Sequence, residues 1–258
     1  MIEFQDVSFS YDERPVIDNT SFTVNDSESV VIMGPSGSGK STILRLILGL
    51  ECPQSGKIFI DGQNICVMKE RQKQEIRKKI GMVFQDGALF DSLSVWENVG
   101  YYLLEHTNLS VDEVGRRAIE LLGFVGLDAD EIKDKLPEHL SGGMQRRVAI
   151  GRALLSTDPR IMLYDEPTTG LDPQSSENVI NLINKLHEER SIASIVVTHQ
   201  IADAIAMADR YLVFIAGEVV FDGTLEELKA CRDVRVLLFL APFRLSIAGV
   251  NKHKFADK

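Results

Sequence analysis

Paired cysteines and an excess of basic residues are both missing from this chain of 258 residues. Cys52, Cys66 and Cys231 lie far apart without C-x-x-C spacing, which favours reduced thiols over a zinc site or a disulfide framework. The formal net charge is −10, with 28 Lys and Arg against 38 Asp and Glu. A general nucleic-acid-binding surface would be basic, so we predict that nucleic acid is not a partner.

Long apolar runs are also missing. The most apolar late stretch, 236–250, is broken by Pro242 and Arg244 and is too short to span a bilayer. The first six residues, Met-Ile-Glu-Phe-Gln-Asp, have neither the basic stretch nor the apolar core of a signal peptide. We therefore expect a chain that works in the cytoplasm. Its length allows one large domain, or a core with an inserted subdomain.

Residues 34–41 read Gly-Pro-Ser-Gly-Ser-Gly-Lys-Ser and match the phosphate-loop pattern G-x-x-x-x-G-K-[ST]. An ordinary Gly/Ser turn is the alternative, but a strand pattern at 29–33 and a helical pattern at 43–50 flank the motif and favour the phosphate loop. Glycines let the backbone wrap closely around phosphates. We expect Lys40 to bind the β- and γ-phosphates of ATP, and Ser41 to bind Mg²⁺. The predicted ATP-binding residues of this loop are Gly34, Pro35, Ser36, Gly37, Ser38, Gly39, Lys40, Ser41 and Thr42.

Strand and helix patterns alternate along the chain, which indicates a mostly parallel α/β core. The first segment, 2–9, reads as a strand with an irregularity in it. Between about 86 and 158 the pattern is mostly helical, with breaks near 109 and 136, which predicts a helical insertion. The other predicted elements are strands at 57–61, 79–84, 161–164 and 194–198, a helix at 175–190 and a hairpin at 211–221.

Four polar residues follow predicted strands. Asp165 and Glu166 come after 161–164, at the edge of the sheet where α/β proteins bind ligands. We expect Asp165 to hold Mg²⁺ and Glu166 to accept a proton from the attacking water. Gln85 is placed to touch Mg²⁺ or that water, and His199 to contact the γ-phosphate. Alone, an acidic pair would indicate a solvated turn, and a single histidine would indicate a structural role. Because a phosphate loop is present in the same chain, we favour a functional role for both.

A second glycine-rich segment, Leu140-Ser-Gly-Gly-Met-Gln145, opens a predicted helix and offers backbone N–H groups to phosphate. Together with the other motifs it follows the order of the ATP-binding cassette family, which the chain resembles to about Leu240. The resemblance implies a RecA-like P-loop NTPase fold: a parallel-sheet core, an N-terminal antiparallel β-subdomain and an inserted α-helical subdomain. The motifs that carry it are the phosphate loop, Gln85, 140–145, 161–166, Gly170-Leu171-Asp172 and His199.

The same resemblance implies an ATPase that works as a homodimer. Ser141, Gly142 and Gly143 of one copy would contact the γ-phosphate bound by the other copy. Asp172 belongs to the loop that links the two sites. Tyr11 is the natural aromatic residue to stack on adenine, although alone it would be an ordinary surface aromatic.

One cassette domain is predicted over 1–240. Its core comprises 1–85 and 159–230, with the helical insertion at about 86–158. The tail, 241–258, is expected to be disordered or packed on a partner.

Within the family, the chain most resembles the ATPase subunits of Mla- and Mce-type lipid-trafficking transporters, on the basis of residues 84–99, Met144 and 232–236. This implies phospholipid movement between inner and outer membranes, with the chain at the cytoplasmic face of the inner membrane as a peripheral subunit. The implied partners are an integral-membrane permease, a lipid-binding protein and a small cytoplasmic regulatory subunit. Apolar residues that would receive the permease, or else belong to the helical core, are Leu89, Phe90, Leu93 and Trp96.

Other functions stay open at this point. A cassette ATPase for an amino acid, a lipoprotein or a cell-division complex is hard to separate, because cargo is chosen by other subunits. A soluble cassette ATPase of DNA repair or translation is disfavoured by the single cassette, the lack of a heptad run and the acidic charge. An inert binding module is disfavoured by the set Asp165, Glu166 and His199.

Overall fold

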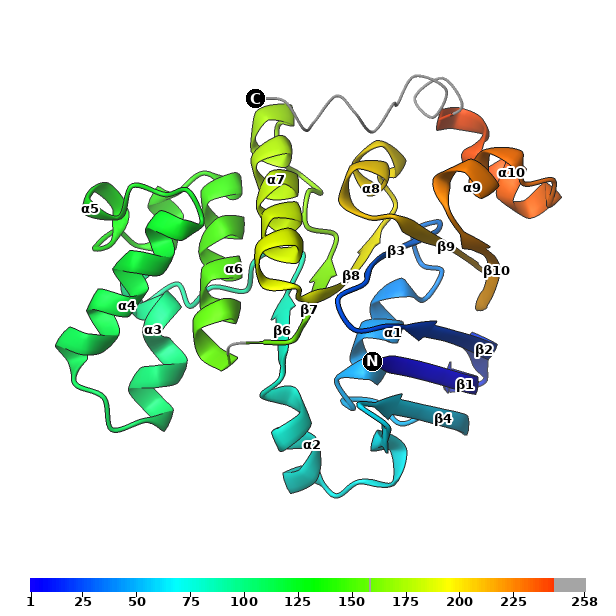
Figure 1. The fold of residues 1–258 in the computed structure, drawn as a ribbon, viewed down its shortest axis with the longest axis horizontal. Coiled ribbons are helices and arrows are strands. Elements are labelled where there is room, and N and C mark those ends of the chain that lie inside the picture. The colour runs from blue at the N-terminus through cyan, green and yellow to red at the C-terminus, as the bar shows by residue number, and fades with distance from the viewer. Residues whose placement is uncertain (158, 244–258) are drawn as a thin grey trace. The chain divides into compact units, whose positions relative to one another are not determined.

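The computed structural model describes residues 1–157 and 159–243 and divides into two compact units. The first unit comprises Met1–Lys73 and the chain from Ala193 onward, and the second comprises Gln74–Ile192. Figure 1 labels most of their helices and strands. Most of the predicted tail lies outside the described residues, and the predicted domain boundaries stay a prediction.

An antiparallel sheet opens the first unit, with strand order β2-β1-β4-β5. Its longest pairing joins β1 to β2, and the register shifts between Phe4 and Val7 and again around Phe9, which confirms the irregularity predicted for the first strand. The rings of Phe4 and Phe22 stack on the buried face with centroids 4.5 Å apart. The strands are β1 (Ile2–Tyr11), β2 (Arg14–Val24), β4 (Ser55–Ile60) and β5 (Gln63–Asn64).

The parallel core of the first unit is built around β3 (Ser29–Met33), which pairs in parallel with β8 (Ala193–Thr198) and β9 (Arg210–Ile215). Every residue of β3 and β8 is buried, as expected for parallel strands covered on both faces. The predicted hairpin is confirmed, since β10 (Glu218–Gly223) pairs antiparallel with β9.

Short helices complete the first unit. Helix α1 follows the glycine-rich loop and buries one face, whereas α2, which crosses from the first unit into the second, is largely polar. The elements are α1 (Lys40–Ile47), the 3₁₀ turn η1 (Ile65–Val67), α2 (Glu70–Arg77), α8 (Ile201–Met207), α9 (Leu225–Ala230), α10 (Val234–Leu240) and η3 (Ala241–Phe243).

The second unit holds two parallel strands, β6 (Ile80–Val83) and β7 (Ile161–Asp165), and most of the helices. From Val95 to β7 the chain is mostly helical, and it leaves the helical conformation near both predicted breaks. The α/β class is confirmed, as are the helices predicted after residue 86. These helices are α3 (Val95–His106), α4 (Val111–Phe124), α5 (Ala129–Ile132), η2 (Pro137–His139), α6 (Gly142–Thr157) and, after β7, α7 (Pro173–Arg190).

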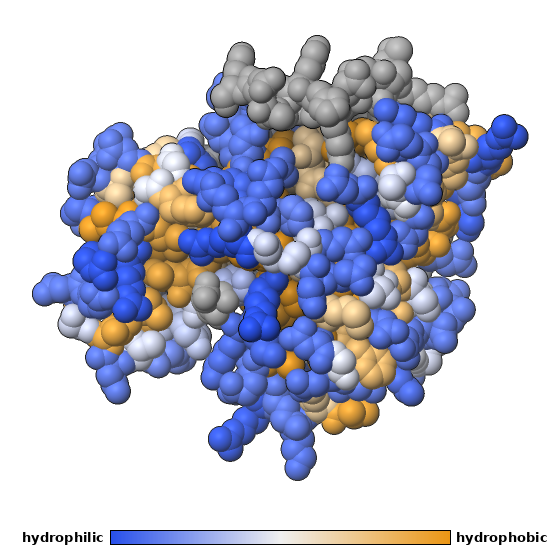
Figure 2. Space-filling model, in the orientation of Figure 1, coloured by the Kyte–Doolittle hydropathy of each residue, from blue (hydrophilic) through white to orange (hydrophobic). Residues whose placement is uncertain are grey.

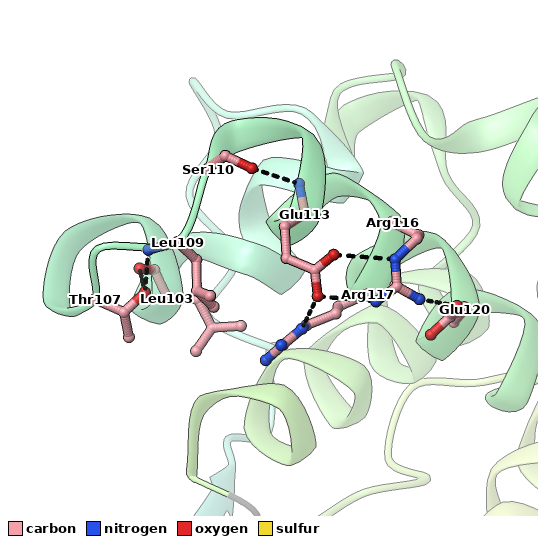
Figure 3. A network of polar contacts seen from close by, with 8 residues as sticks. All are labelled: Leu103, Thr107, Leu109, Ser110, Glu113, Arg116, Arg117 and Glu120. Atoms are coloured by element: carbon pink, nitrogen blue, oxygen red, sulfur yellow. Dashed lines mark hydrogen bonds and ion pairs between the residues drawn. The ribbon is translucent and has the colours of Figure 1, made fainter.

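The outer face of α4 carries a network of charged side chains on the surface of the second unit. Ser110 caps the helix by accepting a hydrogen bond from the backbone N–H of Glu113, and Glu113 also binds two arginines (Figure 3). Hydrogen bonds from Arg116 and Arg117 hold the pKa of the Glu113 carboxyl at about 2. Because these ion pairs are solvent-exposed, the network contributes little to stability.

Candidate active site

Glycine is required by geometry in the loop between β3 and α1. Gly37 and Gly39 have φ angles of 77° and 101°, which L side chains rarely adopt. A Cβ atom on Gly34 would lie 2.1 Å from the carbonyl oxygen of Phe214, and one on Gly39 would lie 2.8 Å from that of Val16. The loop therefore keeps its curved backbone only with glycine at these positions.

This loop brings several hydrogen-bond donors together on a short stretch of backbone. The ammonium of Lys40 donates to the carbonyl oxygens of Gly34, at 2.9 Å, and Pro35, at 3.0 Å, which keeps its charge within the loop. Ser38 Oγ is buried and has no hydrogen-bond partner within the part of the chain that the structure describes. An orphaned hydroxyl, a lysine and the first N–H groups of α1 fit the oxygens of a phosphate chain.

Two other predicted residues of the first unit lie near this loop. Met33 and Thr198 are paired across β3 and β8, so His199 leaves the sheet at the same edge as Gly34. The hydroxyl of Tyr11 accepts a hydrogen bond from Arg45 of α1, at 3.3 Å, and its ring is exposed. Tyr11 thus lies beside the helix that follows the phosphate loop.

The predicted acidic residues lie in the second unit. Val83 and Tyr164 are paired across β6 and β7, so Gln85 and Asp165 leave these strands at one edge. Gln85 is exposed and Asp165 half-buried, whereas Glu166 is only 8% exposed. The structure therefore brings Gln85, Asp165 and Glu166 together at one edge of the second unit.

The predicted Mg²⁺ ligands do not include a cluster of metal-binding side chains within the described residues. Among the residues that the structure describes, no group of three or more His, Cys, Asp and Glu side chains could hold a metal ion. Ser41 of the first unit offers a hydroxyl, and Gln85 and Asp165 of the second unit offer an amide and a carboxylate. Each is an oxygen donor of the kind that Mg²⁺ binds, together with substrate phosphates and water.

Arg146, which sequence reasoning missed, ties the ends of β6 and β7 together. It is only 5% exposed, and its Nη1 donates to the carbonyl oxygens of Phe84, at 3.1 Å, and Glu166, at 3.2 Å. Burial lowers the pKa of its guanidinium, while Asp86 and Asp165 act to raise it. The signal was present in the sequence, because Arg146 shares the helical register of the apolar Ala149 and Ile150.

The second glycine-rich segment has a different construction. Ser141 and Gly142 are exposed, but Gly143 is buried, and a Cβ on it would lie 2.6 Å from Cβ of Ser175 in α7. Asp172 caps α7 by accepting a hydrogen bond from the N–H of Ser175, at 3.0 Å, and contacts with Ser175 lower the pKa of Asp172. The loop of Asp172 is therefore adjacent to the segment of Ser141 within one chain.

Polar and charged side chains cover most of the face shown in Figure 2. The exposed aromatic residues of the second unit are Phe84 and Phe90, which are 43% and 41% exposed, whereas Leu93 and Trp96 are half-buried. No helix in the described part of the chain is both long and apolar enough to cross a membrane.

Residues 17–169 match the protein family described as ABC transporter. The chain is 39% identical to the intermembrane phospholipid transport system ATP-binding protein MlaF of Haemophilus influenzae, over 93% of this chain and 90% of that protein. It is 40% identical to the methionine import ATP-binding protein MetN 2 of Pseudomonas entomophila, over 88% of this chain and 68% of that protein. A dimeric ATP-binding cassette solved in a post-hydrolysis state with ADP and Pi has a TM-score of 0.79 and 35% identity, over 87% of this chain and 98% of that one.

Proposed function

Because this chain belongs to the ABC transporter family of ATP-hydrolysing proteins, we propose that it powers phospholipid transport between two membranes through a separate permease. The predicted family and P-loop NTPase fold are confirmed. One observation carries the choice of cargo: the chain accounts for 90% of a phospholipid-transport relative but 68% of a methionine-import relative of similar identity. Amino-acid import is the second candidate, and the 40% identity to the methionine-import relative supports it.

In this proposal the phosphate loop of the first unit holds ATP. Lys40 binds the β- and γ-phosphates, the amides of the loop and Ser38 bind the remaining oxygens, and the ring of Tyr11 stacks on adenine. The orphaned hydroxyl of Ser38 and the exposed ring of Tyr11 support these roles. Ser41, Gln85 and Asp165 would hold Mg²⁺, which would neutralise charge on the phosphates.

Hydrolysis uses side chains that follow the strands. Glu166 accepts a proton as water attacks the γ-phosphorus, and the bond to the leaving oxygen of ADP breaks. Gln85 orients that water and His199 contacts the γ-phosphate. The low exposure of Glu166 supports its role, because bulk water is largely excluded from this carboxylate.

A second copy completes the site in this proposal. Ser141, Gly142 and Gly143 of the partner copy approach the γ-phosphate, and Asp172 links the two sites. Two features support the arrangement. Ser141 and Gly142 are exposed at the start of α6, and the related post-hydrolysis cassette is a dimer.

The permease docks on the second unit near Phe90. This docking keeps the chain at the cytoplasmic face of the inner membrane. The exposed ring of Phe90 packs against Tyr101, with centroids 4.4 Å apart, and Asn98 bonds both backbone groups of Phe90. Arg152 also holds the preceding loop through the carbonyl of Ala88. A rigidly held, exposed aromatic residue is a suitable anchor for a partner. A lipid-binding protein and a small regulatory subunit complete the proposed assembly.

The transport proposal is tested on the whole complex. The tagged chain is purified from membranes with its permease, and the complex is placed in vesicles that contain fluorescent phospholipid. ATP-dependent transfer of the phospholipid to acceptor vesicles or to the lipid-binding protein is expected. ATP-dependent uptake of methionine without lipid transfer would instead establish amino-acid import.

The role of Glu166 is tested by Glu166→Gln. Turnover should fall by about 10²–10⁴-fold, the range of general-base catalysis, while ATP still binds and holds the protein as a dimer. Glu177→Gln, which changes an exposed carboxylate of α7, is the control and should hydrolyse ATP normally. Near-normal turnover in purified Glu166→Gln would refute the assignment.

A further inference from the structure

The backbone of Glu166 is held in an unfavourable conformation. Its φ angle of 48° lies in the left-handed region, which non-glycine residues with a Cβ atom rarely occupy. Strained residues of this kind persist only when the surrounding structure holds them, and they concentrate at functional sites. The groups that hold Glu166 are therefore candidates for a part in the reaction.

Two residues supply those contacts. The carbonyl oxygen of Glu166 accepts hydrogen bonds from Arg146 Nη1, at 3.2 Å, and from the N–H of Thr169, at 3.3 Å. The hydroxyl of Thr169 donates to Oε2 of the Glu166 carboxylate, at 2.9 Å. The backbone of Glu166 and its carboxylate are thus both bound by residues outside the predicted set.

Arg146 also reaches the loop that carries Gln85. The same Nη1 donates to the carbonyl oxygen of Phe84, which additionally accepts from the N–H of Gly87 at 2.9 Å. One buried nitrogen therefore joins the residue before Gln85 to Glu166 itself. Burying a guanidinium costs free energy. In this chain the buried charge lies where β6 and β7 end.

We propose that Arg146 and Thr169 are positioning residues for ATP hydrolysis: Thr169 orients the Glu166 carboxylate, and Arg146 sets the backbone of Glu166 relative to that of Gln85. The proposal rests on the proposed role of Glu166 as the base. Neither residue is assigned a contact with the nucleotide. Their loss should therefore lower kcat and leave the KM for ATP and the affinity for ATP nearly unchanged.

The hydroxyl of Thr169 is tested by a matched pair of variants. Thr169→Val keeps the shape but removes the donor, and Thr169→Ser keeps the donor. Thr169→Val should lower kcat by roughly 10- to 100-fold, the range for a hydrogen bond to a charged group, with KM within about twofold of wild type. Thr169→Ser should retain most of the activity. Equal losses in the two variants, or a loss confined to KM, would overturn the role.

Arg146 is tested against its neighbour on the same helix. Arg146→Met should lower kcat by about 10-fold or more with KM unchanged, because the buried contacts to two carbonyl groups are lost. Arg147→Met removes a bond from Nη1 to the carbonyl of Gly126 at 2.6 Å, which lies away from Glu166, and should keep kcat. Equal kcat values for the two variants would overturn the role of Arg146. Circular dichroism and the melting temperature check folding, and the pair at Thr169 decides the proposal if Arg146→Met does not fold.

Double variants separate this proposal from the proposed function. In the Glu166→Gln background, Thr169→Val should reduce the residual rate no further, because its effect acts through the Glu166 carboxylate. A multiplicative further loss would overturn the positioning role alone. If Glu166→Gln itself retains turnover, the assignment of the base fails, and the positioning proposal fails with it. If Glu166→Gln is inactive but Thr169→Val matches wild type, only the positioning proposal fails.

Discussion

Two helices of this chain begin with a glycine-rich segment, α1 in the first unit and α6 in the second. At α1 the glycines admit positive φ angles, and Lys40 directs its ammonium back onto the carbonyls of the loop. At α6 the first residues, Gly142 to Gln145, include no basic side chain. Glycine is required at 143 because a Cβ atom there would collide with Ser175. The first segment thus carries its own positive charge for a phosphate. The second is a rigid, uncharged set of N–H donors suited to an anion that is held elsewhere.

The largest effect should come from removing the charge that distinguishes the first helix start. Lys40→Met should reduce turnover by about 10²–10³-fold and also abolish tight ATP binding, because the ammonium meets the phosphates in both the ground state and the transition state. Binding of a fluorescent ATP analogue and steady-state phosphate release measure the two effects. Lys57→Met, at an exposed position of β4, controls for the change in net charge. If Lys40→Met bound ATP with wild-type affinity, the positive charge at the start of α1 would not distinguish it from α6.

A smaller effect should follow from crowding the second helix start. Gly143→Ala places a methyl group against Ser175 and should lower the free energy of unfolding by about 1–3 kcal/mol, the usual cost of overpacking. Urea unfolding measures the change. Gly142→Ala is the matched control, since its Cβ would meet only the flexible end of Leu171, at 3.2 Å. Adding Ser175→Gly should restore part of the stability lost in Gly143→Ala. No restoration would mean that Gly143 is needed for some reason other than this contact.

The smallest effect concerns the cap beside that segment. The pKa of Asp172 is lowered in the folded protein by contacts with Ser175, so its carboxylate stabilises the fold above the ordinary aspartate pKa of about 4. This contribution is lost as the pH falls through the lowered pKa. Asp172→Asn keeps a capping oxygen but removes the charge, so it should be slightly less stable than wild type at pH 7. The difference should shrink below pH of about 4. Urea unfolding at several pH values measures it, and a difference that grows on acidification would contradict the account.

The phosphate loop could be predicted because its requirements are local. Glycine spacing, the lysine and the flanking strand and helix all lie within about 20 residues, and each has a short-range physical meaning. The ends of the strands at Gln85, Asp165 and His199 were predictable for the same reason, since an apolar run followed by a polar residue is a local pattern. The joint catalytic roles of these residues remain a prediction, because they depend on how segments distant in sequence come together.

By itself, the sequence determined the α/β class, the glycine-rich loop that suits phosphate and the acidic residues at the end of β7, because these depend on neighbouring residues and on the periods of helix and strand. Only the tertiary structure decided that Arg146 holds the carbonyl of Phe84, 62 residues away, and that Thr169 binds the carboxylate of Glu166. It also decided that Gly143 makes room for Ser175. Such contacts depend on packing in three dimensions, and a sequence pattern does not specify which buried donor meets which acceptor.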